Sequence, residues 1–358
     1  MDNFKHDEKL YSLSSYDYYL PENLIAQNPI CPRDSSRLLV VDAHEKTVEH
    51  RIFRDITEYI NSNDLLVLND TRVIPARLRI MNKGTKFEIL LLRPTIDLNI
   101  WQALVRPARK LQKGMQIEIY DGAIEIVDKL TDGIWHVGLY PPTGKTALEW
   151  IDEYGETPLP PYIKRSTAGS DSYQTVFARF SGSAAAPTAS LHFTNELLGS
   201  IKMKGARVAF VTLHVGLGTF RPVRSDDIRV HVMHHELCTI PDETAQAICD
   251  CKHNGGRVIA GGTTVMRTLE SFEPGESGVK DTNLFITHGF KFKVADALIT
   301  NFHTPKSSLL MLVSAFTGDH DFLMDTYKEA IRKEYRFFSF GDAMLVKSSG
   351  ELRVKRQR

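Results

Sequence analysis

The sequence predicts an α/β core domain with an inserted antiparallel β-barrel domain. Downstream of Lys204, apolar runs of strand character alternate with helical patterns, which is typical of an α/β core. Between Lys86 and Tyr140 the chain instead carries short, closely spaced strand-like runs, which favour a small antiparallel barrel. We therefore expect the α/β catalytic domain to comprise residues 1–75 and 150–358, and the barrel domain to comprise residues 76–149.

The composition is that of an ordinary globular protein. Of the 358 residues, 42% are hydrophobic and 25% are charged, which is enough apolar material for sizeable cores. Basic and acidic residues number 44 each, and this balance neither favours nor excludes nucleic acid as a partner. The polar N-terminus lacks the apolar stretch of a signal peptide, and no window approaches the roughly 18 apolar residues of a membrane helix. Because four cysteines in this length do not suggest a disulfide framework, we expect a cytoplasmic protein without membrane contact.

The predicted barrel consists of short runs separated by turn residues such as KG, DG and TDG. Apolar side chains occupy every second position in its first and last runs, at Phe87, Ile89, Leu91, Trp135, Val137 and Leu139. The prolines of PPTGK and ETPLPPY break regular structure after the last run, so we expect the barrel to end there.

The predicted α/β core begins with the strand DLLVLND and resumes with the strand RVAFVTLHVG. A helix is expected over DETAQAICDCKHNGG, with Ala245, Ile248 and Cys249 on its apolar face and the two glycines at its end. Further strands and helices follow in RVIAGG, TTVMRTLES, ALITNFH, SSLLMLVSAF and DFLMDTYKEAIRKEYRFF. We expect RFFSFGDAML to end the last strand at Asp342.

A glycine pair and two threonines connect a strand to a helix in RVIAGGTTVMR. Free backbone N–H groups at a helix start bind anions or polar ligand edges, and Arg267 could reach back over such a ligand. This interpretation makes Thr263 and Thr264 ligand contacts. The alternative is an ordinary glycine turn with Thr263 as the N-cap.

Two histidines follow a leucine in similar settings. His192 lies in SAAAPTASLHFT among small residues, and His214 lies in VTLHVGLGTFRPV before Gly216 and Gly218. A histidine at the end of a buried strand, beside glycines, is a common active-site arrangement in α/β folds. The two rings could face one cleft, and the alternative is that each is a hydrogen-bonded core histidine.

The segment HVMHHELC invites a metal interpretation, which we do not adopt. It lacks HExxH, the chain has no CxxC pair, and Cys249 and Cys251 point to different sides of the predicted helix. We expect His234 or Glu236 to act as a general base or a substrate contact instead.

Other polar residues stand where predicted elements begin or end. Asp70 and Arg72 follow a buried strand, where they pair structurally or hold a hydroxyl-rich ligand. Asn301 and His303 stand just before a predicted helix.

Taken together, these segments closely resemble the S-adenosylmethionine:tRNA ribosyltransferase-isomerase family of queuosine biosynthesis. The resemblance runs from about residue 17 to residue 346 through QNPICPRDSSRLLV, DLLVLNDTRVIPARL, LPPYI, AAPTASLHFT, VTLHVGLGTFRPV, GGRVIAGGTT, ALITNFHTPKSSLLMLVSAF and RFFSFGDAML. It implies transfer of the ribosyl part of S-adenosylmethionine to 7-aminomethyl-7-deazaguanine at the wobble position of a tRNA. Epoxyqueuosine in tRNA would form, and adenine and methionine would leave. No metal or further cofactor is implied, because S-adenosylmethionine is a substrate whose sulfonium carries the activation. We expect a monomer.

This chemistry needs a base to remove a proton beside the sulfonium, and histidine suits that task near pH 7. We expect His192 or His214 to be this base, and His234 and Glu236 to handle the amine. The remaining candidates contact substrate: Thr188, Gly216, Gly218, Thr219, Thr263, Thr264, Arg267, Asp70, Arg72, Asn301, His303 and Asp342. We expect basic residues of the barrel, Arg106, Arg109 and Lys110, to help to dock the tRNA.

Four positions depart from the pattern of the family. Ser190 stands where the family has glycine, Val265 replaces a serine, and FITHG brings in His288. His235 stands where the family usually has a small polar residue. A side chain at residue 190 would narrow the expected pocket. Two alternatives therefore stay open: another S-adenosylmethionine-using RNA-modifying enzyme, or a tRNA-binding protein with a decayed site.

Overall fold

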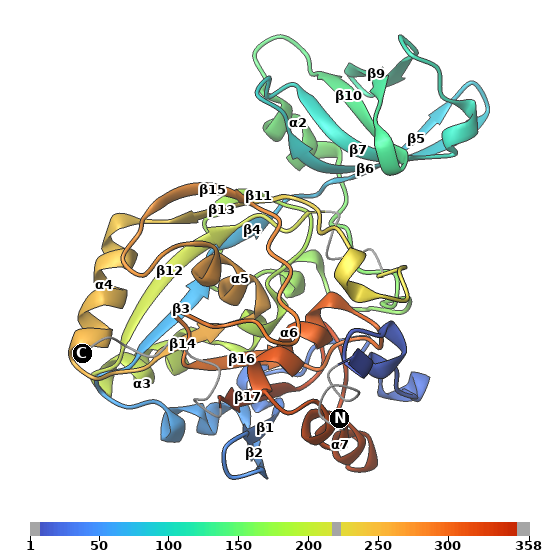
Figure 1. The fold of residues 1–358 in the computed structure, drawn as a ribbon. Helices are drawn as coiled ribbons and strands as arrows, with labels where there is room; N and C mark the ends of the chain where they lie inside the picture. The colour runs from blue at the N-terminus through green and yellow to red at the C-terminus, as the bar shows by residue number, and fades with distance from the viewer. Residues whose placement is uncertain (1–7, 217–222, 349–358) are drawn as a thin grey trace.

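A computed structural model describes residues 8–216 and 223–348 of the chain. These residues form a mixed α/β body with a smaller, nearly closed β-sheet body beside it (Figure 1). The larger sheet has, in spatial order, the strands β15 (Gly278–Thr282), β13 (Glu236–Ile240), β12 (Arg207–Leu213), β3 (Leu65–Asn69), β14 (Val258–Gly261), β16 (Ala297–Asn301), β17 (Ala343–Lys347), β1 (Arg37–Asp42) and β2 (Thr47–Ile52).

Four neighbouring strands in the middle of this sheet run parallel. β12 pairs with β3, β3 with β14, and β14 with β16, all in parallel register. Their carboxyl ends therefore meet at one edge of the sheet, which is where ligands bind in open α/β folds. β17 pairs antiparallel with β16 and parallel with β1, so the run of parallel neighbours stops at β16.

The two faces of the sheet are covered because its strands are apolar on both sides. In β3, Leu65 and Val67 pack against one hydrophobic cluster, whereas Leu66 and Leu68 pack against another. This alternation is that of a parallel strand buried between two layers of helices. The first face is covered by α4 (Asp242–His253), α5 (Thr263–Ser271), α6 (Ser308–Thr317) and α7 (His320–Arg332). The second face is covered by α3 (Asn195–Met203) and the 3-10 helix η4 (Phe53–Tyr59).

The expected apolar face of α4 was wrong at one position. Ala245 and Ile248 are buried, but the cysteine that is buried with them is Cys251, and Cys249 is exposed. A helix turns about 100° per residue, so position 251 continues the stripe of 245 and 248 and position 249 leaves it. Asp342 is also placed differently from the prediction, because it precedes β17 rather than ending a strand.

The smaller body is a six-stranded antiparallel sheet among the described residues. Its order is β5 (Arg77–Asn82), β6 (Thr85–Pro94), β7 (Ile100–Arg106), β10 (Ile134–Tyr140), β9 (Gly122–Lys129) and β8 (Gln116–Ile119). The outer strands β5 and β8 approach each other, so the sheet is nearly closed. The helix α2 (Ala147–Tyr154) packs Trp150 and Ile151 into its core. The division of the chain at residue 149 stays a prediction, and that position lies within α2.

Short elements lie outside the two main sheets or connect their strands. β4 (Thr71–Val73) pairs in parallel with β11 (Phe180–Ser183). The 3-10 turns are η1 (Leu13–Tyr16), η2 (Glu22–Leu24), η3 (Arg33–Ser35), η5 (Ala108–Lys110), η6 (Thr131–Gly133), η7 (Ser170–Tyr173), η8 (Thr188–His192) and η10 (Ile228–Val230).

Among the described residues, no helix has the length and apolar character needed to cross a membrane.

Candidate active site

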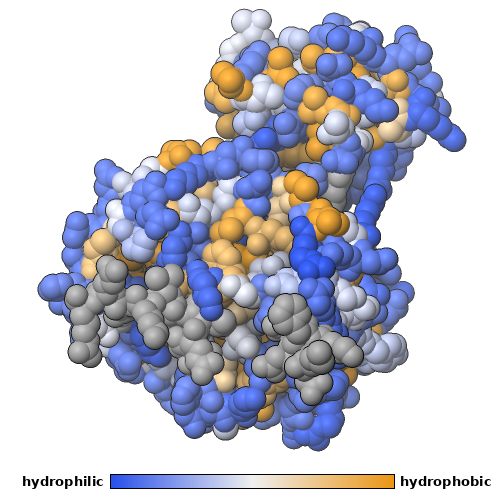
Figure 2. Space-filling model, in the orientation of Figure 1, coloured by the Kyte–Doolittle hydropathy of each residue, from blue (hydrophilic) through white to orange (hydrophobic). Residues whose placement is uncertain are grey.

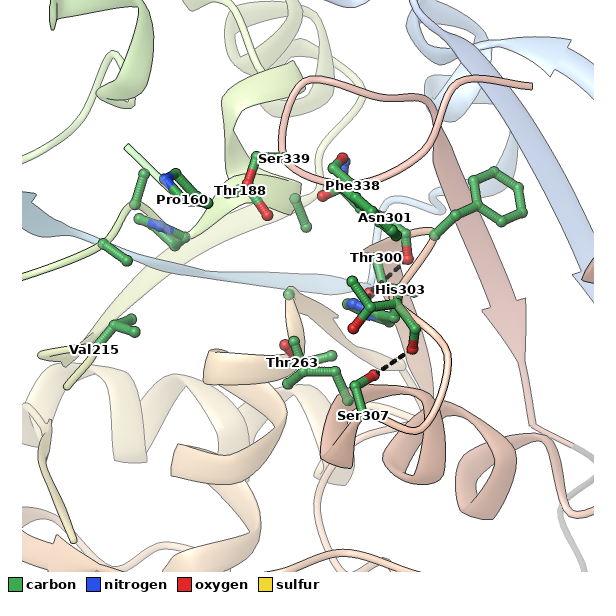
Figure 3. A pocket seen from close by; sticks show the side chains of 18 of the residues that line it. Pro160, Thr188, Val215, Thr263, Thr300, Asn301, His303, Ser307, Phe338 and Ser339 are labelled. Atoms are coloured by element: carbon green, nitrogen blue, oxygen red, sulfur yellow. Dashed lines mark hydrogen bonds between the residues drawn. The ribbon is translucent and has the colours of Figure 1, made fainter. Parts of the chain in front are cut away.

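A cavity of about 220 Å³ opens at the carboxyl ends of the parallel strands. Residues that follow β14 and β16 form much of its wall, and the 3-10 helix η8 contributes Thr188. Figure 3 shows Asn301 and His303 on one side of the cavity and Thr188 on another. The position agrees with the rule that α/β sheets bind ligands beyond the carboxyl ends of their strands.

The side chain of Asn69, at the end of β3, holds the neighbouring strand and helix in place. Its Oδ1 accepts hydrogen bonds from the backbone N–H groups of Thr71 and Leu213, both at 3.1 Å. Its Nδ2 donates to the carbonyl of Leu213 at 3.0 Å and to Oγ1 of Thr264 at 3.2 Å. A fully buried amide with four partners is well satisfied, so it fixes where β12 ends and where α5 begins.

The glycine–threonine turn lies on the wall of the cavity. Gly262 is the N-cap of α5 with φ of 125°, a backbone angle that side chains disfavour. Thr263 is the first residue of the helix and lines the cavity, so the alternative of Thr263 as N-cap was wrong. The first backbone N–H groups of α5 are thus placed beside the cavity.

The lining is neutral and rich in hydroxyl groups and aromatic rings. Tyr162, Tyr173 and Phe338 supply rings, and threonines and serines supply hydroxyls. No carboxylate lies among the described residues that line the cavity, and the ammonium of Lys306 is 2.6 Å from Oδ2 of Asp17. This surface suits an uncharged polar ligand with a flat ring, such as a nucleoside.

Two lining residues adopt backbone angles that are rare for side chains. Phe338 has φ of 70° and Lys306 has φ of 55°. Residues in left-handed conformations gather at ligand sites, where the surrounding structure holds them. The Phe338 N–H donates to the carbonyl of Phe302 at 3.1 Å, which links this turn to the end of β16.

His303 is the histidine on the cavity wall. Its Nε2 lies 2.7 Å from Oγ1 of Thr300, and its backbone N–H donates to the Tyr327 hydroxyl at 3.1 Å. The Tyr18 hydroxyl donates to its carbonyl. Burial lowers the pKa of His303 to about 3, so its imidazole is neutral at pH 7.

His192 does not line this cavity. Its Nδ1 is 2.7 Å from Oγ of Ser36, its Nε2 is 3.1 Å from Nδ2 of Asn301, and its ring stacks on Phe53 at 4.8 Å. The Asn301 amide also donates to the carbonyl of Phe338 at 3.2 Å. Because only the amide nitrogen can donate to a carbonyl, the atom that faces His192 is Nδ2, and Nε2 of His192 is therefore the acceptor. Burial lowers the pKa of His192 to about 3, and nearby Arg336 adds to this. Both ring nitrogens are engaged, which favours a positioning role over proton transfer.

His214 is half-buried at the end of β12. Its Nδ1 is 2.8 Å from Oγ1 of Thr71, and its Nε2 has no hydrogen-bond partner among the described residues. The ring lies over Gly182, where a Cβ would come within 3.0 Å of it. Burial lowers the pKa of His214, so the ring is neutral at pH 7. The expectation that both histidines face one cleft was wrong, because His192 instead lines a separate small cavity.

Glu236 and Arg267 form an ion pair that is almost fully buried, with side chains 1% and 5% exposed. The Gly216 N–H donates to Oε1 of Glu236 at 2.9 Å, and Nε of Arg267 donates to the carbonyl of Leu284 at 3.1 Å. Arg267 therefore does not reach back over the start of α5. A guanidinium in the interior needs a carboxylate partner, and here that partner is Glu236.

Three other predicted contacts lie away from the cavity. Asp70 accepts a hydrogen bond from Oγ1 of Thr212 at 2.7 Å, and burial raises its pKa. Arg72 is exposed on β4. Asp342 accepts from the backbone N–H groups of Arg37 and Arg336 at 3.0 and 2.8 Å, so it fixes the chain ahead of β1 and β17. Gly218 and Thr219 lie outside the described residues.

The departures from the family pattern leave the cavity wall intact. The Ser190 hydroxyl donates to the carbonyl of Gly261 at 2.9 Å and is buried behind the wall, so it does not narrow the cavity. Val265 is fully buried in the core. His288 stands edge-on to Tyr11, with ring centroids 5.8 Å apart.

Sequence reasoning missed the residues that form the wall facing β16. Tyr162 is one of them, and its hydroxyl is 2.8 Å from Oγ of Ser339. Burial raises the pKa of Tyr162, so the phenol stays protonated. The prolines of LPPY and the segment FSFG could have pointed to this wall. Neither contains a catalytic residue type at a spacing that is typical of an active site.

His234 and Gly216 line a second cavity, of about 380 Å³, between the two bodies. Arg93 and Gln102 of the six-stranded sheet line its other side. Among residues 8–216 and 223–348, no group of three or more histidine, cysteine or acidic side chains is placed to hold a metal ion.

The fold and the site define a mixed α/β protein whose ligand cavity lies beyond the carboxyl ends of parallel strands, as in many α/β enzymes. The chain belongs to the queuosine biosynthesis protein family, which it matches over residues 13–346. It is 50% identical over 344 residues to an S-adenosylmethionine:tRNA ribosyltransferase-isomerase of Thermosipho africanus, and 50% identical over 341 residues to one of a Sulfurihydrogenibium species. Each alignment covers 93% of this chain and 99% of the relative.

A solved structure of the same kind of enzyme resembles this one. It is the crystal structure of an S-adenosylmethionine tRNA ribosyltransferase from Thermotoga maritima, with 39% identity and a TM-score of 0.54. The alignment covers 93% of this chain and 99% of the crystallised chain.

The buried ion pair yields a prediction about stability. Replacing Arg267 by Met leaves the Glu236 carboxylate buried without its partner, so the free energy of unfolding should fall by about 3–5 kcal/mol. Urea denaturation measures this. The matched control is Arg332→Met, which removes a largely exposed pair with Glu329 and should cost under about 1 kcal/mol. An equal, small effect of both variants would contradict the account, and the double variant Glu236→Gln/Arg267→Met should recover part of the loss.

Proposed function

We propose that this chain transfers and isomerises the ribosyl moiety of S-adenosylmethionine onto 7-aminomethyl-7-deazaguanine at the wobble position of tRNA. Epoxyqueuosine-tRNA is the product, and adenine and methionine are released. The observation that carries this proposal is 50% identity to named ribosyltransferase-isomerases along nearly the full length of both chains. We also propose a cytoplasmic location, because the proposed substrate is a tRNA.

The adenosyl part of S-adenosylmethionine is the ligand that best suits the cavity beyond β14 and β16. Its purine is uncharged and flat, and Tyr162 and Phe338 offer apolar rings on the wall. The hydroxyls of Thr188 and Thr263 suit a ribose. The free N–H groups at the start of α5, a helix of nine residues, suit the methionine carboxylate, because a helix N-terminus favours an anion.

We assign the general base to His214. The sulfonium acidifies the adjacent 5′ carbon, so a neutral imidazole close to it can remove a proton there. The His214 ring is not part of the lining of the first cavity, but the next residue, Val215, is, and this neighbourhood supports the assignment. The depressed pKa of His214 keeps the ring neutral at pH 7, and Thr71 holds its Nδ1 so that Nε2 is left for the substrate. His192 orients the Asn301 amide instead, and we assign proton removal from the incoming amine to His234, which lines the second cavity.

No metal or further cofactor is needed in this scheme. The positive sulfur of the substrate already stabilises the carbanion character that forms beside it, and methionine leaves as a neutral thioether. The enzyme contributes orientation, proton transfer and exclusion of water.

We further propose that the six-stranded sheet and α2 form an inserted domain and that the protein is a monomer. The sheet has a hydrophobic cluster of its own. Where the chain enters and leaves it, Arg77 and Glu156 exchange backbone hydrogen bonds at 3.1 and 2.8 Å. Paired chain ends are what an insertion into a loop requires.

The reaction itself is tested by mixing the protein with S-adenosylmethionine and tRNA that carries the deazaguanine precursor. Adenine release and epoxyqueuosine formation, followed by liquid chromatography and mass spectrometry, should appear together and in equal amounts. Unmodified tRNA is the control and should yield neither. Formation of S-adenosylhomocysteine would instead identify a methyltransferase, and tight tRNA binding without adenine release would identify a binding protein.

The assignment of the base is tested by His214→Ala and His192→Ala. Loss of a general base should lower turnover of His214→Ala by roughly 10²–10⁴ with little change in stability. His192→Ala should mainly lower the free energy of unfolding, by about 2–4 kcal/mol, because two buried hydrogen bonds lose their partner. In the unaltered protein, the acid limb of the turnover–pH profile should lie below pH 6.5, since a base of lowered pKa stays neutral to lower pH. The assignment of the base to His214 would be wrong if His214→Ala kept near-normal turnover. It would also be wrong if His192→Ala lost turnover while its stability stayed undiminished.

A further inference from the structure

The second cavity differs in character from the first. It lies between the two bodies, and both bodies supply its lining. Its apolar part is formed by Leu92 and Ile134 of the six-stranded sheet and by Val232 and Met233 of the larger body. Val232 is 76% exposed, so its side chain contributes apolar surface to the open side of the cavity. Figure 2 shows apolar side chains on the larger body on the side that faces the six-stranded sheet.

Among residues 8–216 and 223–348, two arginines lie at this cavity, one from each body. Arg93 comes from β6, and Arg224 comes from the loop that precedes η10. Arg224 is exposed and has no acidic partner among the described residues. Asp132 is the carboxylate on the lining, and His231, His234 and His235 add imidazoles. The cleft thus offers two guanidinium groups beside an apolar floor.

Arg93 already holds an acidic group in this structure. Its Nη1 lies 3.2 Å from Oδ1 of Asp281, and its Nε donates to Oε1 of Gln102 at 3.2 Å. Asp281 also lies 3.5 Å from Nδ1 of His235. The pair is half-exposed, with side chains 37% and 46% accessible, so it is weak and open to competition by another anion.

We infer that this cleft binds one nucleotide of the RNA substrate, with its base on the apolar floor and its phosphate between Arg93 and Arg224. A base stacks on apolar and aromatic side chains whatever its identity, and a phosphate is the anion that two guanidinium groups hold best. The phosphate takes the place of Asp281 at Arg93, so RNA binding joins the two bodies across the cleft. The inference rests on the proposed function, because that function supplies RNA as the partner.

Competition between Asp281 and the phosphate for Arg93 predicts two kinds of variant, which change the affinity for RNA in opposite directions. Arg93→Gln and Arg224→Gln each remove a phosphate contact, so each should weaken RNA binding about five- to thirtyfold and reduce the slope of log affinity against log salt by about 1. Asp281→Asn frees Arg93, so it should tighten RNA binding about two- to fivefold. A merely structural role for the Arg93–Asp281 pair would make both Arg93→Gln and Asp281→Asn neutral or harmful.

The experiment measures binding of a 17-nucleotide anticodon stem-loop by fluorescence anisotropy at several salt concentrations, with the full-length protein. The matched control is Arg79→Gln, an exposed arginine of the six-stranded sheet whose Nη1 pairs with Glu156 and which does not line the cleft. It should leave both affinity and salt slope unchanged. Binding of S-adenosylmethionine, measured by calorimetry, should be unaltered in all four variants.

The results separate this inference from the proposed function. The inference would be overturned if Arg93→Gln and Arg224→Gln left the RNA affinity and its salt slope unchanged. It would also be overturned if these variants lost binding of S-adenosylmethionine and kept their RNA affinity. If the unaltered protein binds the stem-loop with the predicted variant effects but releases no adenine from precursor-bearing tRNA, the nucleotide cleft stands and the proposed reaction fails.

Discussion

The geometry of the site depends on one buried amide, that of Asn69. Its four hydrogen bonds join the end of β3 to the end of β12, to the start of β4 and to the first turn of α5. A buried amide that lost even one of these partners would cost about 1–3 kcal/mol, so the arrangement is strongly determined. Because β3, β12, β14 and β16 run parallel, fixing their carboxyl ends also fixes the loops that form the cavity wall. The cavity is thus a consequence of strand direction and of one amide.

The two cavities divide the chemistry of the proposed reaction according to charge. The wall beyond β14 and β16 has no carboxylate among its described residues and one ammonium that is paired with Asp17, which suits a nucleoside. The cleft between the bodies carries two arginines, which suit RNA. The buried pair of Glu236 and Arg267 lies between these regions, since α5 begins at the first cavity and Gly216, which Glu236 holds, lines the second.

Much of the fold could be predicted because period and composition are local properties. Short stretches of chain are enough to show the alternation of buried strands and helices, the closely spaced short strands of the barrel and the glycine–threonine turn. The prediction put Cys249 instead of Cys251 on the buried face of α4. Residue type cannot distinguish two cysteines, so only their spacing along the helix could have done so. The roles of the histidines could not be read in this way. His192 is surrounded by Ser36 and Asn301, which are 156 and 109 residues away, and the sequence does not reveal that both its nitrogens are occupied. Tyr162 and Ser339, which meet across 177 residues, were missed for the same reason.

The central claim is that the adenosyl group of S-adenosylmethionine occupies the neutral cavity at the carboxyl edge of the parallel strands. A crystal structure of the protein with bound S-adenosylmethionine tests it most directly. We expect density for the purine and ribose between Thr188, Gly262 and His303, with the carboxylate at the start of α5. Density for the adenosyl group in the cleft between Arg93 and Arg224, with the first cavity empty, would contradict it.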